Sequence, residues 1–208
     1  MEEKIVYFEQ GGNQNTAETL KLAVERAKAR GVKKLLLAST RGDTAKELAP
    51  MLKGTGIKMV VVPHQYGFGP DGRQRFPLEL VTELAKQGHE VYFGTMLFHT
   101  DGFYGTTSPT TMANLLRTLC QGMKVAVEII LMAANGGRVE IGEQCVVVTG
   151  TGRGADTAVV AYASTTSRLG ELHITEIICK PLQTKQGPPP PPPGGPGGPG
   201  MPPPPPRP

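Results

Sequence analysis

The feature that most constrains the fold is a set of short, continuous apolar runs, each as long as a β-strand. They lie within residues 35–38, 57–62 and 145–149, in which Lys58 and Thr149 are the polar members. Continuous rather than alternating apolar residues are typical of strands that are buried on both faces. Between such runs lie segments with helical spacing, such as the apolar face of residues 20–27, which Gly31 ends. Strands that alternate with helices predict an α/β sheet with helices on both faces.

Helix caps and chain breakers indicate the remaining elements. We expect Asn15 and Glu18 to form a capping box at the start of the first helix, and Pro50 to end or kink the second. The other expected strands are at residues 5–8, 90–95, 158–163 and 173–179. One further helix is expected to start near Thr44 and another to run from Pro77 to Gly88. A long helix is expected from about residue 110 to 134, with Leu115 and Leu119 available for burial.

Composition divides the chain once. Residues 1–186 have the size of one domain with a sizeable core, whereas residues 187–208 contain only proline and glycine apart from Met201 and Arg207. We therefore expect a disordered Pro/Gly-rich tail that cannot enter a core. Its two oligoproline runs favour polyproline II, which suits docking on an aromatic groove of a protein partner. A solvated extension without a partner is the alternative.

Charge and cysteine usage exclude several classes of protein. The net charge is +4 with interspersed signs and 5% aromatic residues, so no nucleic-acid footprint is expected. The longest apolar helical run, residues 125–134, contains Glu128 and is too short for a bilayer, and no signal peptide is expected at the start. Cys120, Cys145 and Cys179 lie in apolar runs, where buried free thiols are expected. These features favour a soluble, reduced, cytoplasmic protein, with no membrane partner and no metal ligands.

Two loops that follow apolar strands have the composition of an anion site. In residues 150–156, three glycines remove the Cβ atoms that would keep a ligand from the backbone, and Arg153 adds a planar cationic donor. Residues 39–44 offer hydroxyl groups and the N-terminus of a helix. Because ligands of α/β sheets bind beyond the carboxyl ends of parallel strands, we expect the two loops to converge on one negatively charged group.

Several segments resemble a family of small prokaryotic proteins that are built like the C-terminal domain of pyruvate kinase. The likeness lies in residues 15–30, 33–47, 122–128 and 145–157, and it covers most of residues 1–181. It implies a three-layer α/β/α domain whose mostly parallel, mixed sheet has an antiparallel member after the glycine loop. In pyruvate kinase the corresponding loops hold a phosphorylated effector, and the stand-alone relatives look like flavin mononucleotide (FMN) binders. The shorter, more aromatic segment 98–105 departs from the family pattern.

The resemblance implies a ligand site, to which the loop after the second strand would add rings that stack on a flavin. Residues 39–44 would hold the phosphate, and residues 150–156 would close the pocket. The expected cofactor-binding residues are Ser39, Thr40, Gly42, Asp43, Thr44, His64, Phe68, Gly150, Thr151, Gly152, Arg153, Gly154, Ala155 and Asp156.

Each of these features also has a purely structural explanation. Residues 39–44 could only cap a helix, and residues 150–155 could form a plain hairpin loop or a Gly-x-Gly-x-x-Ala dinucleotide fingerprint. The fingerprint requires a helix directly afterwards, yet residues 157–163 have an extended pattern. Glu128 is expected to pair with Lys124 rather than to act in catalysis.

The prediction for function is a homo-oligomeric protein that binds a phosphorylated small molecule, FMN in particular, in a redox or sensing role. The first alternative is an enzyme acting on a phosphorylated metabolite, with Glu128, His99 or Asp101 as acid or base. The second is an assembly protein whose proline-rich tail docks a partner. No residue is assigned to catalysis at this point.

Overall fold

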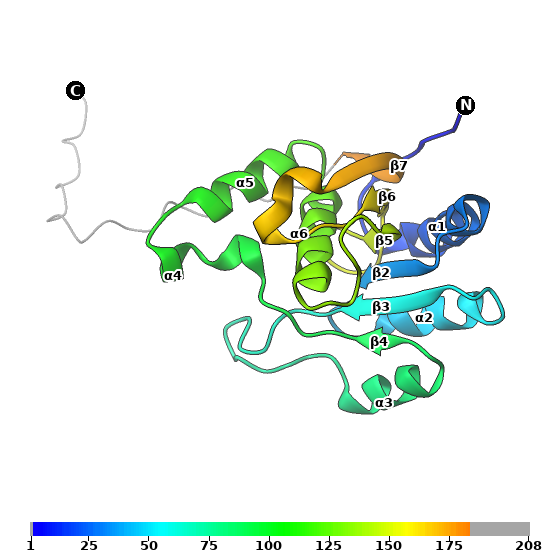
Figure 1. The fold of residues 1–208 in the computed structure, drawn as a ribbon, viewed down its shortest axis with the longest axis horizontal. Helices are drawn as coiled ribbons and strands as arrows, with labels where there is room; N and C mark the ends of the chain where they lie inside the picture. The colour runs from blue at the N-terminus through cyan, green and yellow to red at the C-terminus, as the bar shows by residue number, and fades with distance from the viewer. Residues whose placement is uncertain (1, 184–208) are drawn as a thin grey trace, which may run out of the picture.

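A computed structural model describes residues 2–183, which form an α/β domain in three layers (Figure 1). A seven-stranded sheet has the order β1-β7-β6-β5-β2-β3-β4. The strands are β1 (Val6–Gln10), β2 (Lys34–Ala38), β3 (Lys58–Val62), β4 (Glu90–Val91), β5 (Gln144–Thr149), β6 (Thr157–Tyr162) and β7 (His173–Gln183). The helices are α1 (Thr16–Arg30), α2 (Asp43–Leu52), α3 (Leu78–Lys86), α4 (Asp101–Tyr104), α5 (Ser108–Arg117) and α6 (Gln121–Asn135), with 3-10 turns at Asn13–Asn15, Leu97–His99 and Thr166–Glu171.

The sheet is mostly parallel and mixed, as expected. Strands β5, β2, β3 and β4 run parallel to one another, and β7 pairs in parallel with β1. Strand β6, which follows the glycine loop, is antiparallel to both β5 and β7. The fold class and the antiparallel member are therefore confirmed. An extended strand, and no helix, follows the glycine loop, so the arrangement that a dinucleotide fingerprint requires is not formed.

Both faces of the sheet are buried, which explains the continuous apolar runs. Along β2, Leu35 and Leu37 pack on the side of α1, α2 and α3, whereas Leu36 packs on the side of α6. Successive side chains of a strand point to opposite faces, so a strand between two helical layers needs apolar residues at every position. Figure 1 shows α5 and α6 on the opposite side of the sheet from α1 and α2.

The predicted long helix over residues 110–134 is wrong, because the chain forms two helices with a break before Gln121. Cys120 has extended backbone angles, and its Sγ accepts a hydrogen bond from the Met123 amide at 3.3 Å. The thiol therefore acts as the N-cap of α6. On the preceding segment, Leu115 is 70% exposed and Leu119 is 49% exposed, so the expected burial of these two side chains is also wrong.

Several predicted boundaries also need correction. Strand β4 has only two residues where six were expected. Asn15 does not cap α1, because its side-chain amide donates to the Gln10 carbonyl at 2.7 Å. Helix α2 continues for two residues beyond Pro50. The predicted stop at Gly31 is confirmed by its left-handed backbone.

Two further findings concern the proline-rich tail and the length of the helices. The predicted Pro/Gly-rich tail, residues 187–208, lies outside the described residues. Within residues 2–183, none of the helices combines the length and apolar character needed to cross a bilayer.

Candidate functional site

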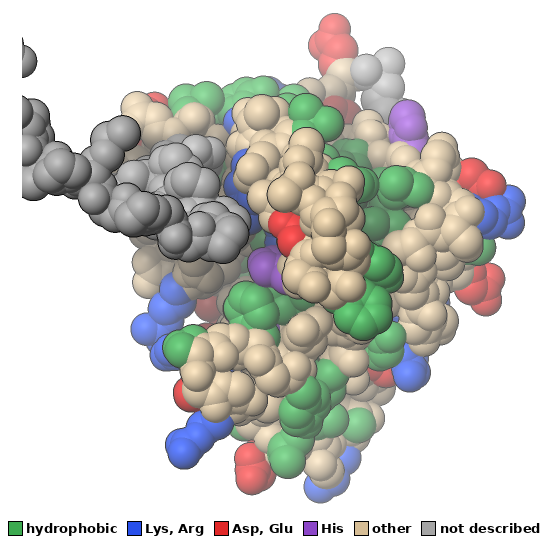
Figure 2. All heavy atoms as spheres, turned by 90° about the vertical axis from the view of Figure 1, so that its left-hand side faces the viewer, with side chains coloured by type: hydrophobic (Ala, Val, Ile, Leu, Met, Phe, Trp, Pro, Cys, Tyr) green, Lys and Arg blue, Asp and Glu red, His purple; other side chains and the backbone are tan. Residues whose placement is uncertain are grey.

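A cavity of about 530 Å³ lies at the carboxyl ends of the parallel strands. Strands β2 and β5 are neighbours in the sheet, so the loops that follow them meet at this edge. Both loops line the cavity, and Arg153 Nη2 contacts Asp43 Oδ2 at 3.2 Å across its mouth. Figure 2 views the molecule from the left-hand side of Figure 1, with a histidine side chain in a recess near the centre and hydrophobic side chains beside it.

The loop after β2 directs the N-terminus of α2 at the cavity. Gly42 turns the chain into the helix with φ 85°, and a Cβ atom there would lie 2.3 Å from Leu80 Cδ2. No side chain caps the helix, so its first-turn N–H groups keep their capacity to bind an anion. Ser39, Thr40 and Thr44 line the cavity beside these groups. Gly42 itself packs against α3 and shapes the loop without lining the cavity.

Asp156 holds the glycine loop in place from behind. This carboxylate is fully buried and accepts hydrogen bonds from the amides of Gly12 and Thr151, at 2.8 and 3.0 Å, and from the Thr157 hydroxyl at 2.8 Å. The Ala155 amide donates to the Thr16 hydroxyl at 3.0 Å. Thr151, Ala155 and Asp156 therefore anchor the loop and do not line the cavity. The members of the predicted set that do line it within this loop are Gly150, Gly152, Arg153 and Gly154.

The cavity lining is rich in positive charge. Only Asp43 and Glu128 contribute carboxylates among its lining residues. The cationic side chains that line it are Arg41, Arg75, Arg117, Lys124 and Arg153. Five cations against two anions favour a negatively charged ligand.

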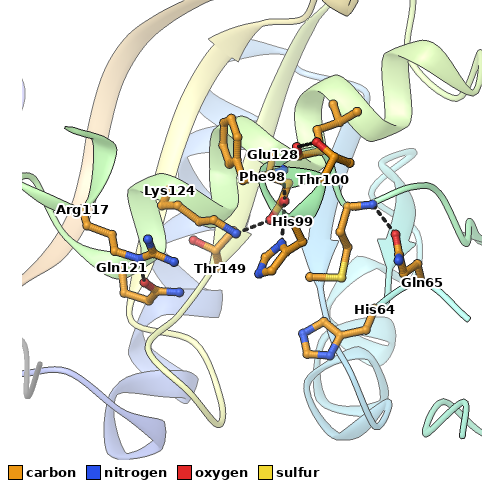
Figure 3. A network of polar contacts seen from close by, with 12 residues as sticks. His64, Gln65, Phe98, His99, Thr100, Arg117, Gln121, Lys124, Glu128 and Thr149 are labelled. Atoms are coloured by element: carbon orange, nitrogen blue, oxygen red, sulfur yellow. Dashed lines mark hydrogen bonds and ion pairs between the residues drawn. The ribbon is translucent and has the colours of Figure 1, made fainter. Parts of the chain in front are cut away.

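At the α6 side of the cavity, three ionisable side chains are in contact (Figure 3). Glu128 Oε2 accepts a hydrogen bond from Lys124 Nζ at 2.5 Å, which confirms the predicted pairing. Glu128 Oε1 accepts from the Phe98 amide at 2.9 Å and lies 3.3 Å from His99 Nδ1. Asp101, another candidate acid or base, does not join this contact, because its Oδ1 accepts from the Thr110 amide at 3.1 Å.

Glu128 remains ionised in this environment. Burial by itself raises the pKa of a carboxyl group, but the hydrogen bond from His99, the charge and hydrogen bond of Lys124 and the Phe98 amide outweigh it and lower the pKa of Glu128 to about 2. Burial also lowers the pKa of Lys124, while the Glu128 charge opposes that change. The pair is 2% exposed at each residue, and a buried charge of this kind requires its partner.

An aromatic series connects the two ends of the cavity. The Phe68 ring lies 4.6 Å from the His64 ring and 5.2 Å from the His99 ring, measured between centroids. His64 Nε2 is 3.4 Å from the Thr40 hydroxyl. Burial, followed by the charge of His99, lowers the pKa of His64. His64 and Phe68, which were predicted to stack on a ring, thus line the same cavity as Glu128 and the loops 39–44 and 150–156.

Sequence reasoning did not assign several lining residues. Arg117 and Gln121 flank the break between α5 and α6, and Arg117 Nε donates to Gln121 Oε1 at 2.8 Å. The sequence did contain one indication that this helix borders a polar cavity. Lys124 and Glu128 are four residues apart in a mostly apolar stretch, and buried charges require a polar environment. Within the described chain, no group of three or more His, Cys, Asp or Glu side chains is placed to hold a metal ion.

Comparisons with known proteins give limited information. No protein-family model matches the chain. Two solved structures of pyruvate kinase from Cryptosporidium parvum, one in complex with ADP, are similar in fold with TM-scores of 0.37 and 0.35. Sequence identity is 14% over 70% of this chain, which spans only 23% of either pyruvate kinase. These similarities are distant, and the architecture is defined by the order and direction of this chain's own strands.

Proposed function

We propose that the cavity binds a phosphorylated small molecule and that FMN is the ligand to test first. The observation that supports this proposal is that two loops, more than a hundred residues apart in sequence, line one cavity with an excess of cationic side chains. A volume of about 530 Å³ is within the range of sites for small molecules and cofactors.

The phosphate fits best between the two loops. The uncapped first turn of α2 offers N–H donors, Thr40 and Thr44 offer hydroxyl groups, and Gly152 allows close approach of the backbone. Arg153 is 72% exposed at its side chain and can exchange its contact with Asp43 for a phosphate oxygen.

The remainder of the cavity suits a flat, partly apolar group. Phe68 and His64 offer ring faces and edges for stacking. The apolar lining residues are Met96, Val125, Ile129 and Met132. A bound flavin would supply redox chemistry at this end, with a redox or sensing role for the protein.

The test compares FMN with riboflavin, which has the same ring but no phosphate. We expect purified protein to quench FMN fluorescence on binding, and to bind riboflavin at least about tenfold more weakly because the phosphate contacts are charge-assisted. Thr44→Val and Arg153→Gln should weaken FMN binding. Arg168→Gln, which removes an exposed arginine paired with Glu171, is the matched control. Equal affinities for FMN and riboflavin would contradict the proposal.

A second candidate function is an enzyme that acts on a phosphorylated metabolite. The contact of His99, Glu128 and Lys124 within the same cavity favours it, because a histidine oriented by a carboxylate is a common proton-transfer arrangement. The two candidates share the phosphate end of the cavity and differ at the other end.

Other predictions are retained as proposals. All three cysteines are buried and free, which suits the proposed cytoplasmic location. Self-association, and the docking of a partner on the proline-rich tail, are proposals based on the sequence.

A further inference from the structure

The α6 side of the cavity contains a histidine that is held by one nitrogen and open at the other. Its Nδ1 lies 3.3 Å from Glu128 Oε1, whereas its side chain is 32% exposed and lines the cavity. Figure 3 shows His99 and Lys124 approaching Glu128 from different directions. Glu128 therefore has three donors, from Phe98, His99 and Lys124, while the second imidazole nitrogen of His99 remains available to a ligand.

The hydrogen bond to Glu128 determines the tautomer of His99. An ionised carboxylate only accepts hydrogen bonds, so His99 Nδ1 carries the hydrogen. The neutral ring then has its lone pair on Nε2. An imidazole base that a carboxylate orients through the second ring nitrogen is a common arrangement in general-base catalysis. Lys124 keeps Glu128 charged, and the Phe98 amide fixes the carboxylate in position.

The surroundings of His99 suit a reaction in which negative charge develops on an oxygen. The lining residues Met96, Ile129 and Met132 are apolar. Lys124 and Arg117 line the same space and carry positive charge. Positively charged donors that face a developing oxyanion stabilise it.

We propose that His99 transfers a proton at the carbon next to the carbonyl group of a phosphorylated sugar or related hydroxycarbonyl compound. This inference rests on the proposed phosphorylated-ligand pocket, in which the phosphate lies between the two loops. The Thr40 hydroxyl contacts His64, and the Phe68 ring contacts both histidine rings, so the rings of His64 and Phe68 link the phosphate end to His99.

The step is balanced without a further reactant. The Nε2 lone pair takes the proton from the carbon, the electron pair of that C–H bond forms a C=C bond, and the carbonyl π pair moves to oxygen. An enediolate faces Lys124 and Arg117, and Glu128 stabilises the imidazolium. If the proton of the adjacent hydroxyl group moves to the enediolate oxygen, return of the Nε2 proton to the former carbonyl carbon gives the isomeric hydroxycarbonyl compound. Return to the original carbon, after the Nε2 proton has exchanged with solvent, gives exchange.

Proton exchange in D₂O tests this inference directly. The full-length protein is incubated with dihydroxyacetone phosphate, ribulose 5-phosphate and fructose 6-phosphate, and deuterium incorporation next to the carbonyl is followed by NMR. We expect incorporation by the wild type with at least one of these compounds, and a loss of at least about 100-fold in His99→Gln. His173→Gln, at an exposed histidine outside the cavity, should exchange like the wild type.

The role of Glu128 as a positioning residue has a separate readout that needs no variant. In NMR spectra of the four histidines, neutral His99 should be the Nδ1–H tautomer. Glu128→Gln should also shift the pH profile of the exchange rate. This variant could fail to fold because Lys124 loses its partner. In that case the tautomer of His99 in the wild type still tests whether Glu128 orients His99. An Nε2–H tautomer would overturn the assignment.

Binding measurements separate failure of this inference from failure of the pocket. Inorganic phosphate is titrated into wild type and His99→Gln, and the amide signals of Thr44 and Gly152 are followed. Phosphate binding without exchange by the wild type, or equal exchange by the variant, overturns the proton-transfer proposal and leaves the pocket intact. If neither phosphate nor FMN binds, the pocket proposal fails and this inference fails with it.

Discussion

Glu128 is the residue at which burial and charge oppose each other most strongly in the cavity. It is 2% exposed and would be costly to ionise alone, yet it contacts Lys124, His99 and the Phe98 amide. Its pairing with Lys124 follows from their spacing in the sequence. The contact with His99 does not, because His99 lies in a separate loop 29 residues away and no local pattern relates the two.

The pH dependence of stability should report this environment. Because the pKa of Glu128 is lowered from 4.5 to about 2 in the folded protein, its contribution is complete above pH 4.5 and is lost as the pH falls through about 2. We expect up to about 3 kcal/mol of unfolding free energy to disappear across this range.

The reference is the double variant Lys124→Met/Glu128→Leu, which replaces the ion pair by apolar side chains of similar volume. Urea unfolding at several pH values should show a smaller acid-induced loss for this variant. Glu176, whose pKa is also lowered, is present in both proteins, so its contribution cancels in the comparison. Identical pH profiles for the two proteins would contradict the assignment.

At the scale of elements, the strands and the loops that follow them could be predicted from sequence, whereas the break before α6 could not. Residues 145–148 are apolar at every position, and Gly150 follows Thr149, so strand and loop are both encoded locally. The break before Gln121 has no glycine or proline, and apolar residues continue through it. Cys120 is extended there and its Sγ caps α6, an interaction that periodicity does not reveal.

Close packing of α6 against β6 gives a prediction about Gly122. A Cβ atom at this position would lie 2.1 Å from Thr157 Oγ1 and 2.4 Å from Thr157 Cβ. Gly122→Ala should therefore destabilise the protein by about 1–3 kcal/mol. Because the Thr157 hydroxyl donates to Asp156, the same variant should also weaken FMN binding.

Gly102→Ala is the matched control for this prediction. Gly102 is also in a helix, and a Cβ atom there meets no atom within 4 Å. Alanine has the higher helix propensity, so the control should be neutral or slightly stabilising in thermal unfolding. A neutral Gly122→Ala would show that α6 can move away from β6.

For the molecule as a whole, the order of the sheet brings together segments that are distant in the chain. Because β2 and β5 are neighbours, the loops 39–44 and 150–156 lie side by side. The sequence alone was compatible with this neighbourhood but did not establish it. Eight of the fourteen predicted contact residues are in these loops and line the cavity, together with His64 and Phe68. Burial explains three of the four exceptions, because Gly42, Ala155 and Asp156 are buried. Thr151, the fourth, is only partly buried and donates its amide to Asp156.

The charge of the cavity should make ligand affinity sensitive to salt. The cavity is lined by five cationic and two anionic residues, and this excess of positive charge attracts a phosphate. Dissolved ions screen the attraction. We expect FMN affinity to fall several-fold between about 50 and 500 mM NaCl, whereas riboflavin affinity should change little. Fluorescence titrations at both salt concentrations measure this, and parallel behaviour of the two ligands would contradict it.

The glycine loop does not stand alone, because the Gly12 amide and the Thr16 hydroxyl reach it from the start of the folded chain. Residues 12–16 therefore support the glycine loop through hydrogen bonds. Loss of these bonds would increase the mobility of the loop without altering any residue that lines the cavity. Substitutions around Gly12 and Thr16 therefore offer a way to tune ligand residence time from outside the binding surface.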